Sequence, residues 1–355
     1  MNTTTTKTII GIDLGDKQHA ICVTDRKGNI LKEFSIRNRI EELKNLADQY
    51  PNSVVAMEVG THSPWISRLF AEHGLQVFVA NARKLRAIYT NPRKSDELDA
   101  QMLAKIAGFD PELLSPITHS SLCSQQDMLA IKMRDTLVRQ RRSLICSIRF
   151  SLKAMGVILP LWSSSVFSKR ALLRLEDQPE VLGSLKPLLH ILNELTTQIK
   201  QFDKSISEIA ETKYPQATWI QQIHGVGPIT SLCFVLHIED PNRFAAKKRR
   251  DVGAYLGLVP RRDQSGQTDK QLPISKAGNS YLRTLLVQSA QYILGHCGPD
   301  CDLRRHGLKL AARGGKAAKK RAIIAVARKL SVIMLSLWQN QSEYQPLRNS
   351  LTTAI

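Results

Sequence analysis

The chain has 355 residues and a hydrophobic content of 43%, which is ordinary for a globular protein and enough for two or three domains with their own cores. Its formal net charge of +19 favours a polyanionic partner, most simply nucleic acid, over a ribosomal or membrane surface. Six cysteines are too few and too scattered for a disulfide framework, so a reducing compartment is expected.

Residues 1–115 alternate short apolar runs with helical patterns. The order β-β-β-α-β-α-β-α predicts a mixed sheet with helices, as in an RNase H-like α/β domain. Strands are expected at Thr8–Leu14, Ala20–Thr24, Ile30–Ile36, Ser53–Val59 and Gln76–Ala80, and helices at 39–50, 64–73 and 95–108, with Ser95 as the cap of the last helix.

Residues 116–213 are expected to be helical. The segment Ser121–Met155 is strongly basic, and its Arg139, Arg141 and Arg142 either follow a nucleic-acid backbone or form a solvated face. Residues 181–209 place apolar side chains at alternating steps of four and three, which predicts a coiled-coil seam. The seam pairs either with a second copy of the chain or with the basic helix. Pro187 is expected in the first turn of the uninterrupted helix.

Residues 214–340 are expected to form a mainly α-helical domain, with a flexible tail at 341–355. The turn at Gly225 and Gly227 lies between two helical segments and is either a helix-hairpin-helix element, whose N–H groups approach phosphate, or a plain turn. Residues 1–100 have a net charge of 14−12 = +2 and the remainder 36−19 = +17, so the rear carries the nucleic-acid grip. Its basic tracts are Lys247, Lys248, Arg249, Arg250, Arg261 and Arg262.

The chain start lacks the basic-then-apolar pattern of a secretory signal. The nearest approach to a membrane span, Ala322–Trp338, is interrupted by Arg328 and Lys329. A cytoplasmic protein with no membrane partner is therefore expected.

Four carboxylates form the first candidate site. Asp13 lies within the first strand and Glu58 ends the fourth, both among apolar residues, where an unpaired charge is costly. Asp96 and Asp99 are three residues apart and share a helix face. Converging carboxylates need cations, and an all-oxygen site favours Mg²⁺, of which two would serve phosphoryl chemistry. Alternatively, Asp96 and Asp99 are first-turn acids favoured by the helix dipole, which does not explain the other two.

The segment Gly11–Gly15 is also similar to the phosphate turn that opens actin-like and sugar-kinase ATPases. Such proteins need a second glycine-rich, acid-bearing turn downstream, and no convincing one is found. The basic rear half also fits that class poorly.

Ser275 and Lys276 form the second candidate site, at an expected loop-to-helix junction. A serine beside cations can act as a nucleophile on a phosphate held by Lys276 and Arg283. Taken without its context, Ser275 is more simply a helix N-cap.

A third cluster offers zinc ligands in a short span, but its spacing matches no standard zinc finger, and a loop is the simpler interpretation. It consists of His296, Cys297, Cys301 and His306.

Taken together, these motifs resemble the DEDD transposases of the IS110 family of bacterial insertion sequences, and most of all its IS1111 branch. The resemblance covers nearly the whole chain. Its motifs are Gly-Ile-Asp-Leu-Gly at Asp13, Met-Glu-Val-Gly-Thr-His-Ser at Glu58, Lys-Ser-Asp-Glu-Leu-Asp-Ala at Asp96 and Asp99, Ile-His-Gly-Val-Gly-Pro at Gly225, Tyr-Leu-Gly-Leu-Val-Pro-Arg-Arg at Tyr255 and Ile-Ser-Lys-Ala-Gly-Asn at Ser275.

The resemblance implies a RuvC-like front domain that holds Mg²⁺ through the four carboxylates, and a rear transposase domain. In that domain Ser275 would form a phosphoserine link to a DNA end. It also implies an element-encoded non-coding RNA that pairs with target and donor DNA. Finally, it implies a dimer or tetramer whose active site joins the carboxylates of one subunit to the serine of another.

Two other functions are compatible with the residues. A RuvC-like, Mg²⁺-dependent junction endonuclease would cut DNA without serine chemistry. A non-enzymatic nucleic-acid-binding protein would not depend on Asp13.

Overall fold

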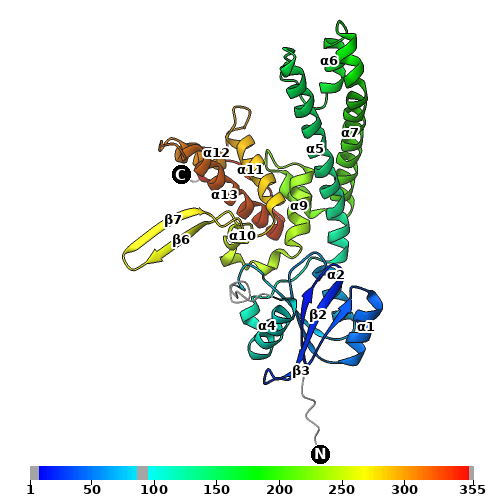
Figure 1. Cartoon of the computed structure of the whole chain (residues 1–355). Helices are drawn as coiled ribbons and strands as arrows, with labels where there is room; N and C mark the ends of the chain where they lie inside the picture. The colour runs from blue at the N-terminus through cyan, green and yellow to red at the C-terminus, as the bar shows by residue number, and fades with distance from the viewer. Residues whose placement is uncertain (1–7, 86–94, 352–355) are drawn as a thin grey trace, which may run out of the picture. The chain divides into compact units, whose positions relative to one another are not determined.

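The computed structural model of the chain describes residues 8–85 and 95–351. The chain divides into two compact units, the first ending at Ser120 and the second beginning at Ser121 (Figure 1). The finer division expected at residues 213 and 340 stays a prediction.

The first unit is built on a five-stranded mixed sheet. Every strand and helix predicted up to residue 115 is confirmed, with ends that agree to within two residues. The elements are β1 (Ile9–Leu14), β2 (Gln18–Thr24), β3 (Ile30–Arg37), α1 (Ile40–Gln49), β4 (Val54–Glu58), α2 (Ser63–Glu72), β5 (Gln76–Ala80), α4 (Asp96–Phe109) and the short 3-10 helix η1 (Pro111–Leu114). The sheet order is β3-β2-β1-β4-β5, with β1 antiparallel to β2 and parallel to β4.

Alternate residues of β1 face two separate apolar layers. Ile10 and Ile12 pack with residues of α1 and α2, whereas Ile9 packs with Ala100 and Ala104 of α4. Because side chains alternate along a strand, Gly11 and Asp13 lie on the same face as Ile9, the face covered by α4.

Gly11 is the point at which α4 approaches the sheet most closely. A Cβ atom on Gly11 would overlap the Ala100 carbonyl oxygen and lie 2.6 Å from the Ala104 nitrogen. Only glycine therefore permits this helix to lie directly against the central strand. The position of α4 along the sheet depends on the missing side chain.

Replacing Gly11 by alanine should therefore destabilise the first unit by about 3 kcal/mol, because helix backbone must move to make room for the methyl group. Native-state hydrogen exchange of the β1 and β4 amides measures this loss. Gly60→Ala is the matched control, since a Cβ there meets nothing within 4 Å. Unchanged exchange in Gly11→Ala would contradict the close-packing account.

The second unit is mostly helical. Its elements are α5 (Leu122–Ala154), α6 (Phe167–Arg174), α7 (Pro179–Thr212), α8 (Gln216–Gln221), α9 (Pro228–Ile238), η2 (Pro241–Arg243), η3 (Ala246–Lys248), α10 (Asp251–Tyr255), β6 (Pro260–Ser265), β7 (Thr268–Ile274), α11 (Ser280–Leu294), α12 (Asp302–Ala311), α13 (Ala318–Asn340) and α14 (Arg348–Leu351). The basic helix predicted from Ser121 is confirmed as α5, with Ser121 as its cap.

The predicted seam of α7 packs along α5 of the same chain (Figure 1). Leu185, Leu192, Ile199 and Ile206, seven residues apart, are all buried. Of the two partners considered for the seam, α5 thus covers it in this structure. Arg134 of α5 adds an ion pair to Asp203 of α7 at 2.7 Å.

The prediction that Pro187 lies in the first turn of the helix is wrong. α7 begins at Pro179 and continues through Pro187. A proline inside a helix removes one backbone hydrogen bond, but burial of Leu185 and Leu189 on either side holds the helix together across it.

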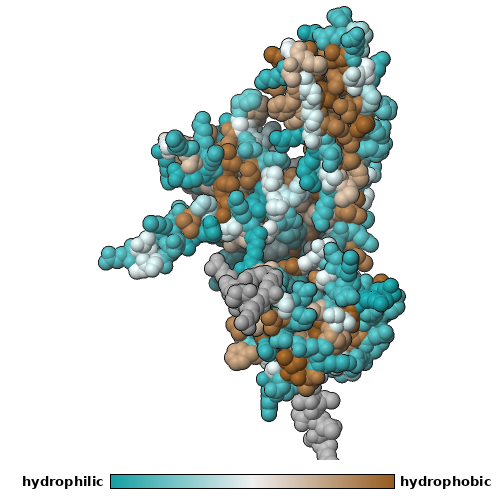
Figure 2. All heavy atoms as spheres, viewed as in Figure 1, coloured by the Kyte–Doolittle hydropathy of each residue, from teal (hydrophilic) through white to brown (hydrophobic). Residues whose placement is uncertain are grey.

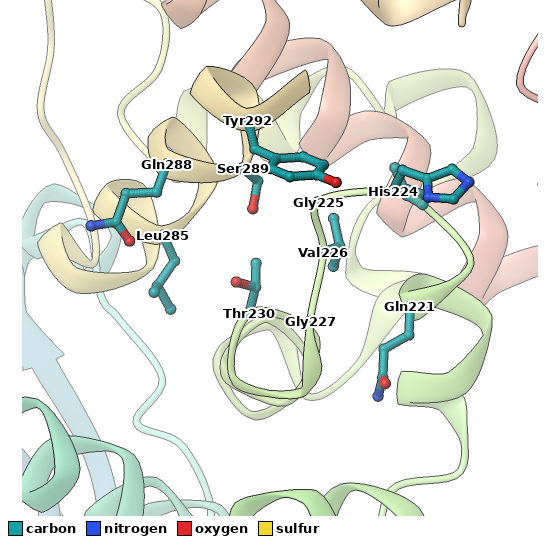
Figure 3. Close-up of a pocket in the computed structure, with 11 residues that line it drawn as sticks. Gln221, His224, Gly225, Val226, Gly227, Thr230, Leu285, Gln288, Ser289 and Tyr292 are labelled. Carbon is teal, nitrogen blue, oxygen red and sulfur yellow. The ribbon is translucent and has the colours of Figure 1, made fainter. Parts of the chain in front are cut away.

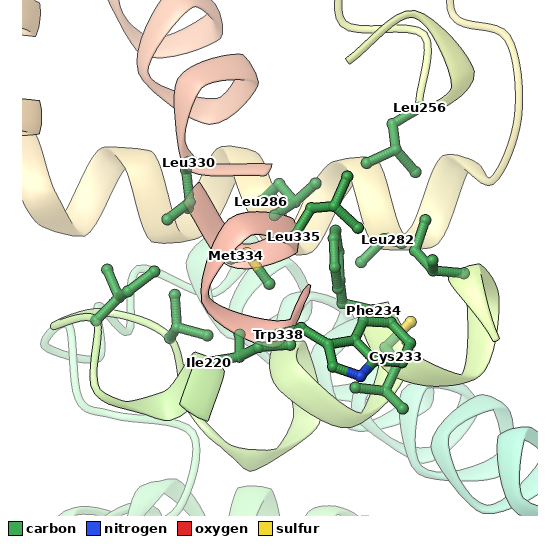
Figure 4. Close-up of a cluster of buried hydrophobic side chains, with 14 of the residues drawn as sticks. Ile220, Cys233, Phe234, Leu256, Leu282, Leu286, Leu330, Met334, Leu335 and Trp338 are labelled. Atoms are coloured by element: carbon green, nitrogen blue, oxygen red, sulfur yellow. The ribbon is translucent and has the colours of Figure 1, made fainter. Parts of the chain in front are cut away.

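The core of the second unit joins α8, α9, α11 and α13 around Phe234 and Trp338 (Figure 4). α13 is the one helix in the described parts of the chain that is long and apolar enough to cross a membrane. Half of its most apolar window is buried, however, and Leu330 and Met334 lie in this core. Such burial is typical of the core helix of a globular unit.

The β6–β7 hairpin was not predicted from the sequence. Its residues are exposed except near Pro260 and Ile274, so it lacks the alternation of apolar and polar residues that reveals a half-buried strand. Pairing of Arg262 with Gln271 and of Ser265 with Thr268 defines its register.

Residues 341–351, expected to be a flexible tail, are held against the second unit. The Tyr344 nitrogen donates to the Gln222 side chain at 2.8 Å, and the Asp302 nitrogen donates to the Pro346 carbonyl at 2.8 Å. Residues 352–355 lie outside the described part of the chain.

Candidate functional site

Asp13 and Glu58 lie side by side near the C-terminal ends of two neighbouring parallel strands, β1 and β4. β1 and β4 run parallel with Ile12 opposite Met57, so the next residues, Asp13 and Glu58, follow this pair at the C-terminal ends of the two strands, one residue before the end of β1 and at the last residue of β4. Ala56 packs in the layer under α4, and alternation places Glu58 on that same face. The two predicted strand carboxylates therefore lie at the same end of neighbouring strands and on the same face of the sheet.

α4 brings a third carboxylate to this face. Asp99 is 7% exposed and immediately precedes Ala100, whose carbonyl oxygen lies against Gly11. Ser95 caps the helix by accepting from the Leu98 nitrogen at 3.3 Å, as predicted. Asp96 lies in the first turn and is exposed, as expected for an acid that interacts with the helix dipole.

Within residues 8–85 and 95–351, no three His, Cys, Asp or Glu side chains stand close enough together to hold one metal ion. The donor set nonetheless suits a hard cation, because all three carboxylates on the α4 face offer oxygen ligands. Strand ends and the position of α4 bring the three carboxylates to one face of the sheet. A bound cation would draw their side chains closer together.

An imidazole at the same sheet edge was missed in the sequence. His62 follows β4 and lies 3.0 Å from Asp16, which follows β1. The Trp65 indole N–H can only donate, and it donates to Nδ1 of His62 at 3.2 Å. Nδ1 is therefore the acceptor, and Nε2 of the neutral ring carries the proton that is donated to Asp16. The motif around Glu58 contained His62, but no sequence signal indicated its partners.

Ser275 does not cap the helix that follows it. Asn279 is the N-cap of α11, and its side chain accepts from Tyr281 and Leu282 nitrogens at 2.9 and 3.1 Å. Among residues 8–85 and 95–351, the one hydrogen bond of the Ser275 hydroxyl is a long bond of 3.4 Å that it accepts from the Ala277 nitrogen. The simpler interpretation of Ser275 as a cap is therefore wrong, and its hydroxyl has no strong structural use.

Two glycines lock the Ser275 loop against the end of α10. A Cβ on Gly257 would overlap the backbone of Ala277, and one on Gly278 would overlap the Tyr255 carbonyl oxygen. Both glycines have positive φ, of 69° and 67°. Backbone bonds from Ser275 to Val259 and from Lys276 to Gly257 complete the contact, at 2.9 and 3.2 Å. The two sequence motifs are thus the two sides of one interface.

Lys276, beside Ser275, adopts φ of +54°, which is uncommon for a residue with a side chain. Arg283 of α11 supports this loop from below, since its Nη1 donates to the Leu256 and Ala277 carbonyls at 3.1 and 2.8 Å. Its predicted role in nucleic-acid binding stays a prediction, and one nitrogen of its guanidinium is occupied by the loop.

Tyr255 packs against a half-buried histidine. The rings of Tyr255 and His237 lie 5.2 Å apart, and Arg243 lies 4.9 Å from the Tyr255 ring on another side. Burial, with a smaller contribution from the Arg243 cation, lowers the pKa of His237 to about 4. His237 is therefore neutral near pH 7.

The predicted turn at Gly225 and Gly227 joins α8 to α9. Gly225 has φ of +89° and packs against α11, where a Cβ would lie 2.7 Å from the Tyr292 ring. Gly227 is the N-cap of α9. The turn borders a hollow of about 510 Å³ that is also lined by α11 (Figure 3).

Like Arg283, three further arginines that were predicted to bind nucleic acid have structural partners that lie on other elements or across the hairpin. Arg249 donates to Ser336 and Asn340 at the end of α13, at 3.3 and 2.9 Å. Arg262 pairs with Asp269 across the hairpin through two bonds of 2.7 Å. Arg141 donates to Thr196 at 3.3 Å and is half-buried beside α7.

The remaining basic residues are exposed. Arg139 pairs with Asp135 at 3.0 Å and donates to the Thr136 hydroxyl at 3.4 Å, both on its own helix. Among the described residues, no partner is found for the side chains of Arg142, Lys247, Lys248, Arg250 and Arg261. Their predicted role in nucleic-acid binding stays a prediction.

The cluster of His296, Cys297, Cys301 and His306 lies around the start of α12. Cys301 is the N-cap of α12 and accepts from the Arg304 nitrogen at 3.4 Å, while Cys297 is exposed. This gives the Cys301 thiol a structural role that needs no metal.

Asn279→Ala should destabilise the second unit by about 1 kcal/mol, because it removes the α11 cap. Ser275→Ala should leave stability unchanged within a few tenths of that value. Thermal unfolding of the two variants measures the difference. A larger loss for Ser275→Ala than for Asn279→Ala would restore the cap interpretation.

The stability of the second unit should fall as pH drops from about 6.5 towards 4. An unfolded His237 titrates near 6.5 and the folded one near 4, so between these values the unfolded state binds the extra proton. The full effect is roughly 3 kcal/mol. His237→Phe keeps a ring under Tyr255 and should flatten this slope in unfolding measured across that range. An identical slope in the variant would exclude His237 as its source.

Comparison with known proteins gives two family matches. Residues 10–156 match the DEDD transposase family of IS110, and residues 217–304 match the family described as "Transposase IS116/IS110/IS902 family". The chain is 28% identical to the "Transposase for insertion sequence element IS1111A" of Coxiella burnetii, covering 95% of this chain and 91% of that protein. It is 30% identical to the "Transposase for insertion sequence element IS1328" of Yersinia enterocolitica, covering 80% and 83%. The chain therefore belongs to the IS110 family of insertion-sequence DEDD transposases.

Proposed function

We propose that this chain is an RNA-guided DNA recombinase of an insertion sequence, in which Ser275 is the nucleophile and the carboxylates hold Mg²⁺. The observation that carries the proposal is the Ser275 loop. Its backbone is fixed by close glycine contacts, yet its hydroxyl is left out of the α11 cap. A nucleophile needs a fixed position and a hydroxyl group that is not held in a strong structural hydrogen bond.

In the proposed reaction, Ser275 Oγ attacks a DNA phosphorus atom. The Oγ–P bond forms while one P–O bond to a sugar oxygen breaks; the serine loses its proton and the released oxygen gains one. Lys276 and Arg283 lie beside this position and would stabilise the charge on the phosphate. Rejoining reverses the step with a different sugar hydroxyl.

The metal site is assigned to Asp13, Glu58, Asp96 and Asp99. Membership of a DEDD family implies dependence on a divalent metal, and the oxygen-only donors favour two Mg²⁺. The bound ions would supply charge stabilisation on the attacked phosphate. Asp13, Glu58 and Asp99 would hold them from the α4 face of the sheet, and Asp96 would join from the first turn of α4. The five-stranded mixed sheet with its helices supports the assignment of this unit as an RNase H-like, RuvC-like domain.

The partners are assigned as element-end and target DNA, and a structured non-coding RNA that supplies target choice. Residues 303–342 contain ten Lys and Arg and no Asp or Glu, so the rear of the chain offers more than one polyanion surface. The cytoplasm, where such nucleic acids occur, is the proposed location.

A homodimer or homotetramer is proposed, with carboxylates and serine from different subunits. The end of the α5–α7 pair supports a protein partner, because it has apolar side chains that are exposed in the described part of the chain. Figure 2 shows brown apolar surface on this arm. Phe150, Ile158, Leu161 and Leu173 are 73%, 75%, 96% and 66% exposed. We propose that the end of this arm, including the segment between α5 and α7, presents these residues to a second copy.

The test is a denaturing gel of labelled element-end DNA incubated with the chain, Mg²⁺ and RNA transcribed from the element flanks. A labelled band at protein size is expected with the wild type. It should be lost in Ser275→Ala, in Asp13→Asn and after metal chelation, because nucleophile and cations are both needed. Ser280→Ala, an exposed serine five residues away, is the matched control and should keep the band.

Cut DNA with no covalent band in the wild type would contradict the serine mechanism. It would instead support a hydrolytic, RuvC-like junction endonuclease. Full activity of Asp13→Asn in cells would support a protein that only binds nucleic acid.

A further inference from the structure

The residue pairing between β1 and β4 stops just before the two strand carboxylates. Ile12 and Met57 form the last pair, although β1 continues to Leu14 and β4 to Glu58. In the described part of the chain, this ladder therefore does not reach across from Asp13 to Glu58. The separation of the two carboxylates depends on contacts that lie beyond it.

His62 provides such a contact between the loops that leave the two strands. Asp16 comes three residues after Asp13, in the turn between β1 and β2. His62 comes four residues after Glu58, immediately before α2. Oδ1 of Asp16 lies 3.0 Å from Nε2 of His62. Because the Trp65 indole N–H donates to Nδ1, the proton of the neutral ring is on Nε2 and is donated to Asp16.

The loop that carries His62 is tightly held. Ser63 is fully buried, and its Oγ accepts from the Gly60 nitrogen at 3.0 Å and donates to the Gly60 carbonyl at 2.9 Å. Nε2 of His119 lies 2.9 Å from the same oxygen. A loop fixed in this way has little freedom to absorb a shift, so a displacement of His62 would be passed on to Glu58.

The turn that carries Asp16 is also constrained. A Cβ on Gly15 would overlap the Gln18 carbonyl oxygen, so the turn is tight. The Asn38 side chain donates to the Asp16 carbonyl at 3.2 Å, and the Asn38 nitrogen donates to the Lys17 carbonyl at 2.9 Å. Segments that follow β1, β3 and β4 thus meet at one link, and the length of this link bears on the spacing of the strand ends.

The link between His62 and Asp16 lies where it contributes little to folding. The side chain of Asp16 is 93% exposed and that of His62 is 26% exposed. Pairs so open to water add little net free energy of folding. Such a contact can nonetheless favour one spacing of two strand ends over others of similar energy, as the groups that orient metal ligands do.

We propose that His62 is a positioning residue of the metal site, and that its bond to Asp16 sets the spacing of Asp13 and Glu58. Mg²⁺ demands near-ideal octahedral geometry, so it binds best where the ligand oxygens already stand at the required separation. Ligands held in advance at that spacing bind the cation more tightly. His62 itself would touch neither the cation nor the DNA. This role rests on the metal site assigned under the proposed function.

The test is calorimetric titration of the full chain with MnCl₂, a probe of the metal site that requires neither DNA nor chemistry. The dissociation constant should rise about tenfold in His62→Ala and about fivefold in Asp16→Ala, because each variant removes the link. The melting temperature of metal-free Asp16→Ala should equal that of the wild type, since Asp16 is so exposed. Weaker binding in His62→Ala alone, with wild-type affinity in Asp16→Ala, would overturn the proposal.

Asp16→Asn separates the link from a direct role of the carboxylate. The amide oxygen of asparagine can still accept from Nε2–H, so this variant should bind Mn²⁺ as the wild type does. Asp48→Ala removes an exposed carboxylate of α1 and should also leave the affinity unchanged. If Asp16→Asn lost as much affinity as Asp16→Ala, the charge of Asp16 would act on the cation itself and the proposal would be wrong.

A double variant tests whether the two residues act through each other. His62→Ala combined with Asp16→Ala should bind Mn²⁺ no more weakly than His62→Ala alone, because the link can be lost only once. Losses that multiply to about fiftyfold would show independent effects and would overturn the proposal.

The Mg²⁺ dependence of the covalent DNA band separates positioning from chemistry. In His62→Ala, the Mg²⁺ concentration that gives half of the maximal band should rise about tenfold, and saturating Mg²⁺ should restore the full band. A band that saturating Mg²⁺ does not restore would contradict a positioning role. Absence of the band in the wild type, with the Mn²⁺ affinities as expected, would refute the serine mechanism and leave the link in place. A wild type that binds no Mn²⁺ would overturn both the metal assignment and the link.

Discussion

Close backbone approach at glycine is the constraint on which both candidate sites depend. In the first unit, the missing Cβ of Gly11 lets α4 lie against the central strand, which places Asp99 on the face shared by Asp13 and Glu58. In the second unit, Gly257 and Gly278 let the end of α10 and the Ser275 loop touch through their backbones. In each case side chains that carry chemistry are positioned by a contact that involves no side chain.

Most of the first unit could be predicted because the signals for its strands and helices lie within short stretches of sequence. β1, β2 and β4 are short runs of mostly buried apolar residues, and α4 has a clear start at its cap Ser95. The carboxylates were also found, since an acid within a buried strand is unusual. The pairing of His62 with Asp16 could not be found, because it depends on two loops that are 46 residues apart.

The second unit was predicted less completely, for reasons that particular residues show. The β6–β7 hairpin is exposed on both faces and has no hydrophobic period. Pro187 suggested a helix start, but the seam of buried leucines around it outweighed the lost hydrogen bond. In the sequence, Arg249 and Arg262 were predicted to bind nucleic acid. In the structure, Arg249 donates to Asn340, 91 residues away, and Arg262 donates to Asp269, 7 residues away. Asparagine is a favoured N-cap residue, so Asn279 could have been predicted as the cap of α11. The cap was instead considered at Ser275, four residues earlier.

These contacts give the transposase a consistent division of labour. Under the proposed function, the first unit would present carboxylates from the ends of its sheet strands, and the second would present a serine and cationic side chains from a helical frame. The most direct test of this account is peptide mapping by mass spectrometry of the protein–DNA adduct after nuclease digestion. The account predicts a nucleotide mass on the peptide that contains Ser275. A nucleotide on any other residue, or none on the protein, would contradict it.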